Sequence, residues 1–151
     1  AVLICRHVEA GVLMKLDNLE TMIKDYERRT GERVDLSGFY FDENNNYKDK
    51  YNYYFKFFPG AGFLFWTINE FNGAKYFTIW QTYGDMKVIG KYIVDVMKLN
   101  DLDIIVTATH RSVKGFIKKW NMERVPTMDY SYNGFNYKVL KTVRKHLEAT
   151  L

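Results

Sequence analysis

The chain has 151 residues, of which 47% are hydrophobic and 17% aromatic, and its formal net charge is +4. This length and apolar content suit one domain with one core, so we predict a single domain over residues 1–151. The charge permits an anionic partner but is also ordinary for a soluble domain, and no run of like charges reaches the five or six of a binding tail.

The cysteine count and the hydropathy of the sequence indicate in which cellular compartment the protein resides. The single cysteine, Cys5, excludes an internal disulfide, which favours a reducing compartment. No apolar stretch approaches the roughly 18 residues that span a bilayer, and the first residues lack a signal-peptide pattern. We therefore predict a cytoplasmic protein without a membrane partner.

The first third of the chain predicts a strand, a helix and a polar connection. Residues 1–8 are apolar apart from Arg6 and His7 and predict a strand. Residues 13–29 carry an apolar stripe at helical spacing, and Thr30-Gly31 is typical of a helix end. Residues 32–50 are rich in Asn and Asp and predict a solvated connection.

Three aromatic and β-branched segments follow, and they predict an antiparallel meander. They span residues 51–58, 63–71 and 75–82, separated by a Pro-Gly turn at 59–62 and by Asn72-Gly73. Asn-Gly is a strong hairpin signal because both central residues of a type I′ turn need positive φ.

The second half predicts a helix over 86–99, a strand over 102–107 and a helix over 112–120. A helical connection of this length joins parallel strands, so the fourth and fifth strands should pair in parallel. Residues 125–132 and 135–142 flank Asn133-Gly134 and predict another hairpin, with a short helix over 144–151.

The predicted fold class is therefore α/β with a mixed sheet, in which an antiparallel meander becomes parallel at strands four and five and helices cover both faces. Ligands in such sheets bind beyond the carboxyl ends of the strands where the pattern changes. Here that place is 81–86, with 109–112 beside it.

This order resembles the GNAT (Gcn5-related N-acetyltransferase) fold over residues 1–143. The family carries Gln/Arg-x-x-Gly-x-Gly/Ala between its fourth strand and the next helix, and this chain has Gln81-Thr82-Tyr83-Gly84-Asp85-Met86. A helix N-terminus offers unpaired N–H groups and a positive dipole end to a pyrophosphate. The resemblance implies that acetyl-CoA or another acyl-CoA binds, as a substrate, to Ile79, Trp80, Gln81, Thr82, Tyr83, Gly84, Asp85, Met86 and Lys87.

The chain also departs from the GNAT pattern. Met86 replaces Gly or Ala, and Asp85 places a carboxylate where the pyrophosphate is expected, unless Lys87 offsets it. Ile117 stands at the position of the tyrosine that protonates the leaving thiolate, and it has no proton to donate. His110, which we expect to follow a strand and open the last helix in the position of a family Asn, and Tyr83 remain as catalytic candidates.

Asn121-Met122 replaces the Gly-Phe that follows the last GNAT helix. Asn121 is a suitable substitute for the glycine because Asn tolerates the left-handed conformation that ends a helix. Glu70 and Asp129 are candidates for the base that takes a proton from the acceptor amine, although both are also ordinary polar positions of half-exposed strands. The three histidines and one cysteine have no ligand spacing, so we predict no metal site.

The resemblance implies transfer of an acyl group from acyl-CoA to an amine of a small molecule, a protein or a nucleic-acid base, by a possible homodimer. A second hypothesis is a catalytically silent GNAT-fold protein, similar to those of bacteriophages, that acts as a virion or host-interaction component in the host cytoplasm or virion. A third is nucleic-acid modification or binding through basic and aromatic side chains. The aromatic residues of 51–66 are equally compatible with packing in a core.

Overall fold

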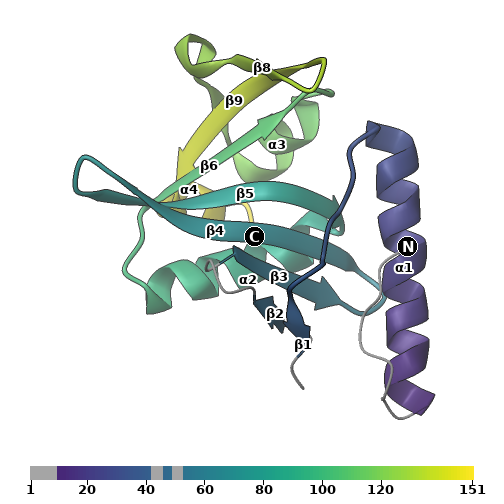
Figure 1. Ribbon diagram of the computed structural model, residues 1–151. Coiled ribbons are helices and arrows are strands. Elements are labelled where there is room, and N and C mark those ends of the chain that lie inside the picture. Colours follow the sequence, from purple (N-terminus) through teal and green to yellow (C-terminus); the bar gives the residue numbers. More distant parts are fainter. Residues whose placement is uncertain (1–9, 42–45, 49–52) are drawn as a thin grey trace. The chain divides into compact units, whose positions relative to one another are not determined.

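The computed structural model describes residues 10–41, 46–48 and 53–151 (Figure 1), and of residues 10–17, 40–41 and 46–48 it describes the backbone alone. The strand predicted over residues 1–8 lies outside the described residues. The chain forms two compact units, which we describe separately. Unit 1 comprises Ala1–Trp66 and Gln81–Asp85, and unit 2 comprises Thr67–Trp80 and Met86–Leu151.

Unit 1 contains a long helix and the strands on which it packs. The helix α1 (Ala10–Thr30) precedes strands β1 (Tyr40–Phe41), β2 (Asn46–Lys48) and β3 (Tyr53–Phe58). Strand β4 (Gly62–Phe71) begins in this unit, and β5 (Ala74–Gly84) ends in it. Strands β1, β2 and β3 pair antiparallel in chain order. The connection predicted over 32–50 therefore holds two short strands that sequence reasoning missed.

The core of unit 1 lies between α1 and the aromatic strands. It contains apolar side chains from the helix, from the segment after it, and from β3 and β4: Leu19, Ile23, Tyr26, Val34, Leu36, Phe55, Phe57 and Phe63. The helix ends at the predicted place, where Gly31 has φ 72° and its N–H donates to the Glu27 carbonyl at 2.8 Å. Part of the aromatic cluster noted in the sequence is thus core.

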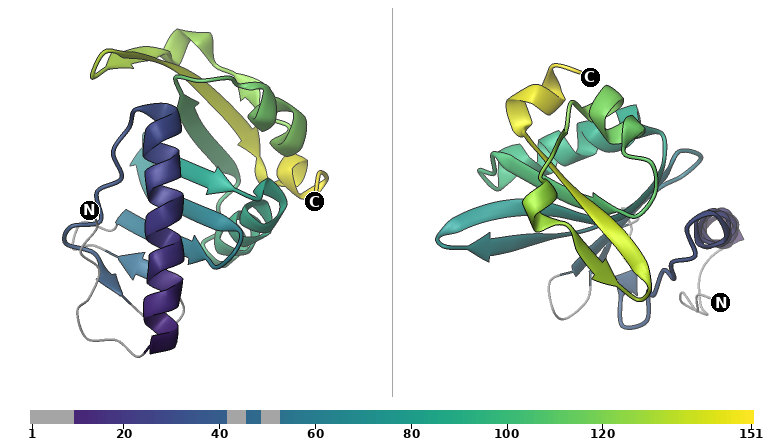
Figure 2. Two further views of the ribbon diagram at one scale, coloured as in Figure 1. Left: turned by 90° about the vertical axis from the view of Figure 1, so that its right-hand side faces the viewer. Right: turned by 90° about the horizontal axis from the view of Figure 1, so that it is seen from above.

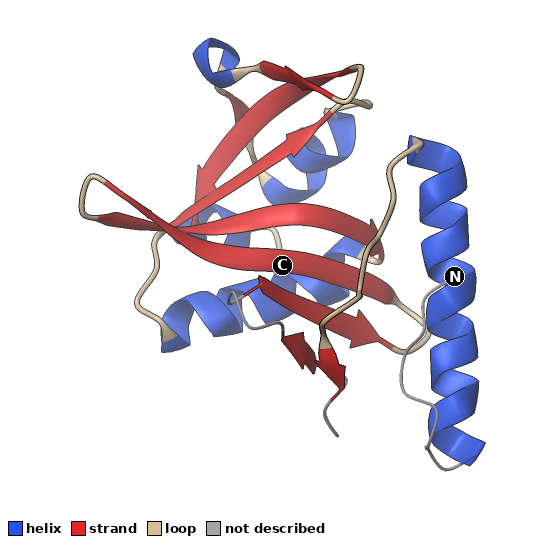
Figure 3. Cartoon of the chain, in the orientation of Figure 1, coloured by secondary structure: helices blue, strands red, loops and turns tan. Residues whose placement is uncertain are grey.

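Unit 2 contains the parallel pair and the remaining helices. Helix α2 (Met86–Leu99) leads to β6 (Ile104–Thr109), α3 (Lys114–Trp120), β7 (Glu123–Arg124), the 3-10 helix η1 (Pro126–Met128), β8 (Tyr130–Tyr132), β9 (Phe135–Val143) and α4 (Arg144–Glu148). Strand β5 pairs with β6 in parallel, from Tyr76↔Ile104 to Ile79↔Thr107. Strand β6 pairs with β9 antiparallel. The sheet is mixed, as predicted (Figure 3).

Both predicted Asn-Gly turns are confirmed. Asn72 and Gly73 have φ of 50° and 79°, and Asn133 and Gly134 have φ of 50° and 81°. The strand predicted over 125–132 is wrong in its first half, because Pro126 begins the 3-10 helix there and cannot donate to a strand ladder. Asp129 consequently lies between η1 and β8 and not in a strand.

Helices α2, α3 and α4 lie together on one side of β6 and β9 (Figure 2). Trp120, which is 1% exposed, donates from Nε1 to the Met86 carbonyl at 2.9 Å and so joins α3 to the start of α2. Gly90 of α2 is close enough to Trp120 and Leu151 that a Cβ there would meet the Leu151 side chain at 2.9 Å. The absence of a side chain at Gly90 thus leaves the space that Trp120 and Leu151 occupy.

Candidate functional site

The end of β5 carries the Gln-x-x-Gly segment, and its first side chain is bound within unit 1. The Gln81 amide donates to the Glu32 Oε1 at 3.2 Å and to the Arg33 carbonyl at 2.9 Å. Glu32 Oε1 also accepts from the Tyr26 hydroxyl at 2.6 Å. Gln81 therefore ties β5 to the segment that follows α1.

Gly84 is required by the packing of its own backbone. It has φ 109°, and a Cβ there would lie 1.9 Å from the Ala61 carbonyl oxygen. The approach is reciprocal, because a Cβ on Gly62 would lie 1.8 Å from the Tyr83 carbonyl oxygen. The two glycines let β4 and β5 touch where the first begins and the second ends. This contact accounts for Gly84 without a ligand.

Asp85 connects β5 to α2. Its N–H donates to the Ala61 carbonyl at 2.8 Å, so the N–H immediately before the helix is occupied. Aspartate is favoured at the residue before a helix, where its carboxylate can accept from N–H groups of the first turn. Asp85 and Lys87 are exposed and Met86 is half-buried, so an acid just before α2 and a base in its first turn both face solvent.

Tyr83 gives its phenolic proton to a carboxylate of α1. Its hydroxyl donates to Asp25 Oδ2 at 2.7 Å, and its ring stacks on Phe63 with centroids 5.6 Å apart. The bond to Asp25, with burial and the nearby negative charge, raises the pKa of Tyr83. Tyr83 thus keeps its proton at neutral pH but directs it at Asp25.

Asp25 is the centre of a charged cluster that sequence reasoning missed. Arg28 Nη2 lies 2.6 Å from its Oδ1, and Arg29 Nε lies 3.0 Å from its Oδ2. The hydrogen bond from Tyr83, followed by that from Arg28, lowers the pKa of the Asp25 carboxyl to about 2. The i,i+3 and i,i+4 spacing of Asp25 with the two arginines is a helical ion-pair signal. The contact with Tyr83 has no such local signal.

The remaining candidates upstream of Gln81 lie in unit 2. Ile79 is buried, and its carbonyl accepts from the Thr107 Oγ1 at 3.2 Å on the paired strand. Trp80 is 43% exposed. Within unit 1, Thr82 donates from Oγ1 to the Phe63 carbonyl at 3.3 Å. The Ile79 carbonyl therefore already accepts a hydrogen bond from a side chain of the neighbouring strand.

His110 lies in a bend after β6 and not at the start of a helix, since α3 begins at Lys114. Its ring stacks on Phe135 with centroids 4.1 Å apart and meets the Tyr137 ring edge-on at 5.4 Å. Ile117 is 41% exposed on α3. Asn121 ends that helix with φ 52° and donates from its N–H to the Phe116 carbonyl, which confirms its left-handed role.

Asp129 holds the β8–β9 hairpin together, and Glu70 is an exposed residue of β4. Asp129 Oδ1 accepts from the Val139 N–H at 2.9 Å, and its Oδ2 pairs with Arg124. The backbone bond from Val139 is the main cause of the lowered pKa of Asp129. The carboxylate is a fixed acceptor in this arrangement.

Two other kinds of site are absent from the described part of the chain. Within 10–41, 46–48 and 53–151, no group of three or more His, Cys, Asp or Glu side chains is placed to hold a metal ion. No helix in these same ranges is long and apolar enough to cross a membrane.

No protein-family profile matches the sequence, and no curated protein matches it. Solved structures do match. FeeM, an N-acyl amino acid synthase from uncultured soil microbes, aligns over 91% of this chain and 95% of its own, with a TM-score of 0.57 and 8% identity. The chain has the GNAT fold.

The GNAT assignment concerns the fold alone, because 8% identity carries no information on substrates. Naa50 of Arabidopsis thaliana, solved with the bisubstrate analogue CoA-Ac-MVNAL, aligns over 90% of this chain and 95% of its own, with a TM-score of 0.48 and 13% identity. What this GNAT-fold chain does has to be argued from its own residues.

Proposed function

We propose that this chain is a cytoplasmic acyltransferase that binds an acyl-CoA at 84–87 and transfers its acyl group to an amine. The observation that carries the proposal is the exposed start of α2, a helix of 14 residues that directly follows Gly84-Asp85 in a GNAT fold. The N–H groups of its first turn and the positive end of its dipole suit a pyrophosphate.

The parallel strand pair supports the same proposal. Within unit 2, pairing of β5 with β6 extends to Ile79↔Thr107, whereas β5 continues in this unit to Trp80 and β6 to Thr109. Strands that continue past their last paired residues expose backbone donors and acceptors, which an amide-bearing chain such as pantetheine can bind. The Ile79 carbonyl can accept a hydrogen bond from pantetheine only if its hydrogen bond from the Thr107 hydroxyl is broken.

The reaction is a direct transfer. The acceptor amine attacks the thioester carbonyl, a C–N bond forms, the C–S bond breaks, and the thiolate leaves. The amine loses one proton to a base and the thiolate gains one from an acid. Because Tyr83 directs its proton at Asp25 and Ile117 has none, His110 is the candidate we favour for the acid. FeeM is an N-acyl amino acid synthase, so amino acids are the first acceptors to test.

Asp85 provides a sharp test of where the cofactor binds. Asparagine caps helices as well as aspartate does, so Asp85→Asn removes the charge and keeps the cap. If the pyrophosphate lies at the start of α2, Asp85→Asn should tighten acetyl-CoA binding about five-fold or more in a calorimetric titration, since two negative charges then no longer repel. Lys87→Gln should weaken binding, and Lys91→Gln, one turn along the same helix, is the matched control.

The titration can contradict the proposal in two ways. If acetyl-CoA binds but Asp85→Asn and Lys87→Gln leave its affinity unchanged, the cofactor lies elsewhere. If the folded protein shows no heat with either acetyl-CoA or coenzyme A, the acyltransferase proposal fails. Substitutions of Gly84 are unsuitable for this purpose because they disturb the contact with Ala61.

A second candidate is a GNAT-fold protein without catalysis that acts as a virion or host-interaction component. One observation favours it: the side chains at the segment are engaged in holding the fold, with Gln81 bonded to Glu32 and Arg33 and Tyr83 to Asp25. Absence of acetyl-CoA binding would support this candidate, and turnover with any amine would exclude it.

A further inference from the structure

One face of the β8–β9 hairpin carries four aromatic rings, and His110 at the end of β6 packs against it. Tyr130 is opposite Tyr137 and Tyr132 is opposite Phe135, so the four side chains point to one face. Tyr132 is 63% exposed and Tyr130 44% exposed. His110 stacks on Phe135 with ring centroids 4.1 Å apart and meets Tyr137 edge-on at 5.4 Å. The histidine that we favour as the acid of the transfer is therefore held against this face.

The helices of unit 2 lie on the other side of these strands. Thr142 of β9 donates from Oγ1 to the Asn121 carbonyl at the end of α3 at 3.0 Å, and both Thr142 and Leu140 are buried. Side chains alternate along a strand, so residues 135, 137, 139, 141 and 143 point away from the helices. The ring-bearing face is thus the face of β6 and β9 that α2, α3 and α4 leave uncovered (Figure 2).

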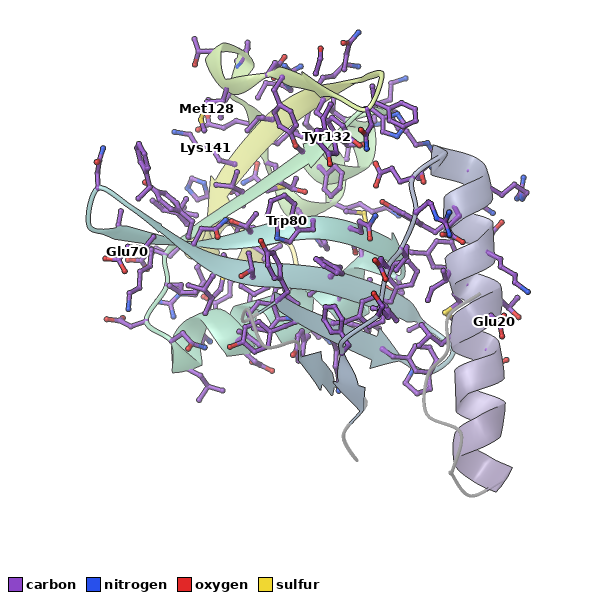
Figure 4. The ribbon with its side chains drawn as sticks, in the orientation of Figure 1. Glu20, Glu70, Trp80, Met128, Tyr132 and Lys141 are labelled. Carbon is purple, nitrogen blue, oxygen red and sulfur yellow. The ribbon has the colours of Figure 1, made fainter. Side chains whose placement is uncertain are left out.

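Trp80 of β5 lies on the same side of the sheet. Ile79 pairs with Thr107, and Thr107 pairs with Leu140, so these three buried residues share the helical side. The next residues of β5 and β6, Trp80 and Ala108, therefore point to the ring-bearing side. Trp80 is 43% exposed and is labelled in Figure 4. We define the aromatic face as the following residues: Trp80, His110, Tyr130, Tyr132, Phe135 and Tyr137.

The side of the sheet that carries the aromatic face has little charge. Among the described residues 76–80, 104–110 and 135–143, alternation places one fixed charge on this side, that of Lys141. Lys141 lies 3.9 Å from Glu123, which is its register partner on β7. The positions between Trp80 and the rings of the hairpin are filled by apolar side chains. A ligand on the aromatic face would therefore meet uncharged rings.

An acceptor amine has to lie next to His110 if His110 is the acid of the transfer. In the tetrahedral intermediate the amine nitrogen and the thioester sulfur are bonded to the same carbon, so a group that protonates the sulfur is also close to the amine. We place the pyrophosphate of the cofactor at the start of α2, which lies on the helical side. The side that carries the aromatic face is therefore left for the acceptor.

From this arrangement we propose that the aromatic face binds the side chain of the acceptor, and that the acceptor is an amine with an aromatic, uncharged side chain. This inference rests on the proposed acyl transfer and names its substrate class. Aromatic rings attract one another in stacked and edge-on arrangements, and the face of a ring also attracts a protonated amine. A carboxylate or a second ammonium group would be placed here without a counter-charge, since Lys141 and Glu123 pair with each other.

The first test is binding of 2-phenylethylamine to the full chain in the presence of coenzyme A, followed by saturation-transfer NMR. We expect transfer to the ring protons of 2-phenylethylamine and none to ethanolamine, which has no ring. Titration should show about five-fold weaker binding by Tyr132→Ala because one ring contact is lost. Tyr132→Phe, which keeps the ring, should restore most of that affinity.

Phe71→Ala is the matched control for Tyr132→Ala. It removes a ring of unit 2 that is 68% exposed at the tip of the β4–β5 hairpin and is not part of the aromatic face. This variant should bind 2-phenylethylamine as the wild type does. Circular dichroism establishes that each variant is folded.

The second test is acetylation of the same amines with acetyl-CoA, followed through the released thiol. The kcat/KM for 2-phenylethylamine should exceed those for ethanolamine and 1,4-diaminobutane about ten-fold or more. Tyr132→Ala should raise KM for 2-phenylethylamine about five-fold at unchanged kcat, as expected for a contact made equally in the ground state and the transition state.

The outcomes separate failure of this inference from failure of the proposed function. If amines are acetylated but ethanolamine serves as well as 2-phenylethylamine, or Tyr132→Ala and Phe71→Ala behave alike, the transfer stands and the aromatic face is not the acceptor site. If Tyr132→Ala changes KM for hexanoyl-CoA but not for 2-phenylethylamine, the rings hold the acyl chain instead. If no amine is acetylated, the acyl transfer fails and the acceptor site fails with it, even where 2-phenylethylamine binds.

Discussion

The end of β5 and the β8–β9 hairpin differ in what their side chains are used for. At the end of β5, Gln81, Tyr83 and Gly84 each have a partner within unit 1 that explains their identity. On the hairpin, Tyr130 and Tyr132 present large exposed rings that the fold does not require to be there. Residues that match a functional motif can therefore be kept for their role in the fold. Exposed aromatic side chains, in contrast, can lie in a segment that matches no motif.

Gly84→Ala should have the largest effect in this comparison. Its Cβ would meet the Ala61 carbonyl oxygen at 1.9 Å at φ 109°, so we expect a loss of about 3 kcal/mol or more in the free energy of unfolding. Gly73→Ala is the matched control, because φ is 79° there and no atom lies within 4 Å; its cost should be about 1 kcal/mol. Urea unfolding measures both. Equal losses would show that Gly84 is not kept by the contact with Ala61.

Thr107→Val should have an intermediate effect. Valine keeps the shape of the buried side chain but removes the hydroxyl that donates to the Ile79 carbonyl. We expect a loss of about 1–2 kcal/mol in thermal or urea unfolding, because the carbonyl is left without this donor. A loss below about 0.5 kcal/mol, within the range of ordinary surface substitutions, would mean that the bond is dispensable and that the Ile79 carbonyl is available to a ligand.

Tyr83→Phe should have the smallest effect, visible mainly in the titration of Asp25. The bond from Tyr83 is the first cause of the low pKa of Asp25, so the variant should raise that pKa from about 2 toward 3.8. A folded-state pKa below the unfolded value stabilises the protein above about pH 4, and this contribution is lost as the pH falls toward 2. In the variant the contribution is smaller and is lost at higher pH. Carboxyl NMR titration measures the shift, and an unchanged pKa would exclude the role of Tyr83.

The sequence predicted best the elements whose signals are local. The two Asn-Gly turns need positive φ at adjacent residues, and both hairpins form where expected. Helix α2 begins and ends at the predicted residues because its apolar stripe is regular. By contrast, β1 and β2 have two and three residues, and strands this short depend on pairing with β3 more than on their own composition.

The candidate site was predicted less well than the fold. The motif located the start of α2, but it did not show that Gln81 is bonded to Glu32 and Arg33 or that Tyr83 is bonded to Asp25, 58 residues earlier. His110 was placed at a helix start, whereas it lies in a bend stacked on Phe135. Contacts between distant segments have no spacing signal in the sequence, so only the tertiary structure reveals them.

By itself the sequence determined the periodic helices, the hairpin turns and the parallel crossover, because hydrophobic period and turn chemistry act over a few neighbouring residues. The tertiary structure decided that Gly84 faces a carbonyl, that Asp25 accepts from Tyr83, and that the rings of β8 and β9 share one exposed face. Those properties depend on strand register and on close approach of remote segments, where a shift of one residue would reverse which side chains are exposed.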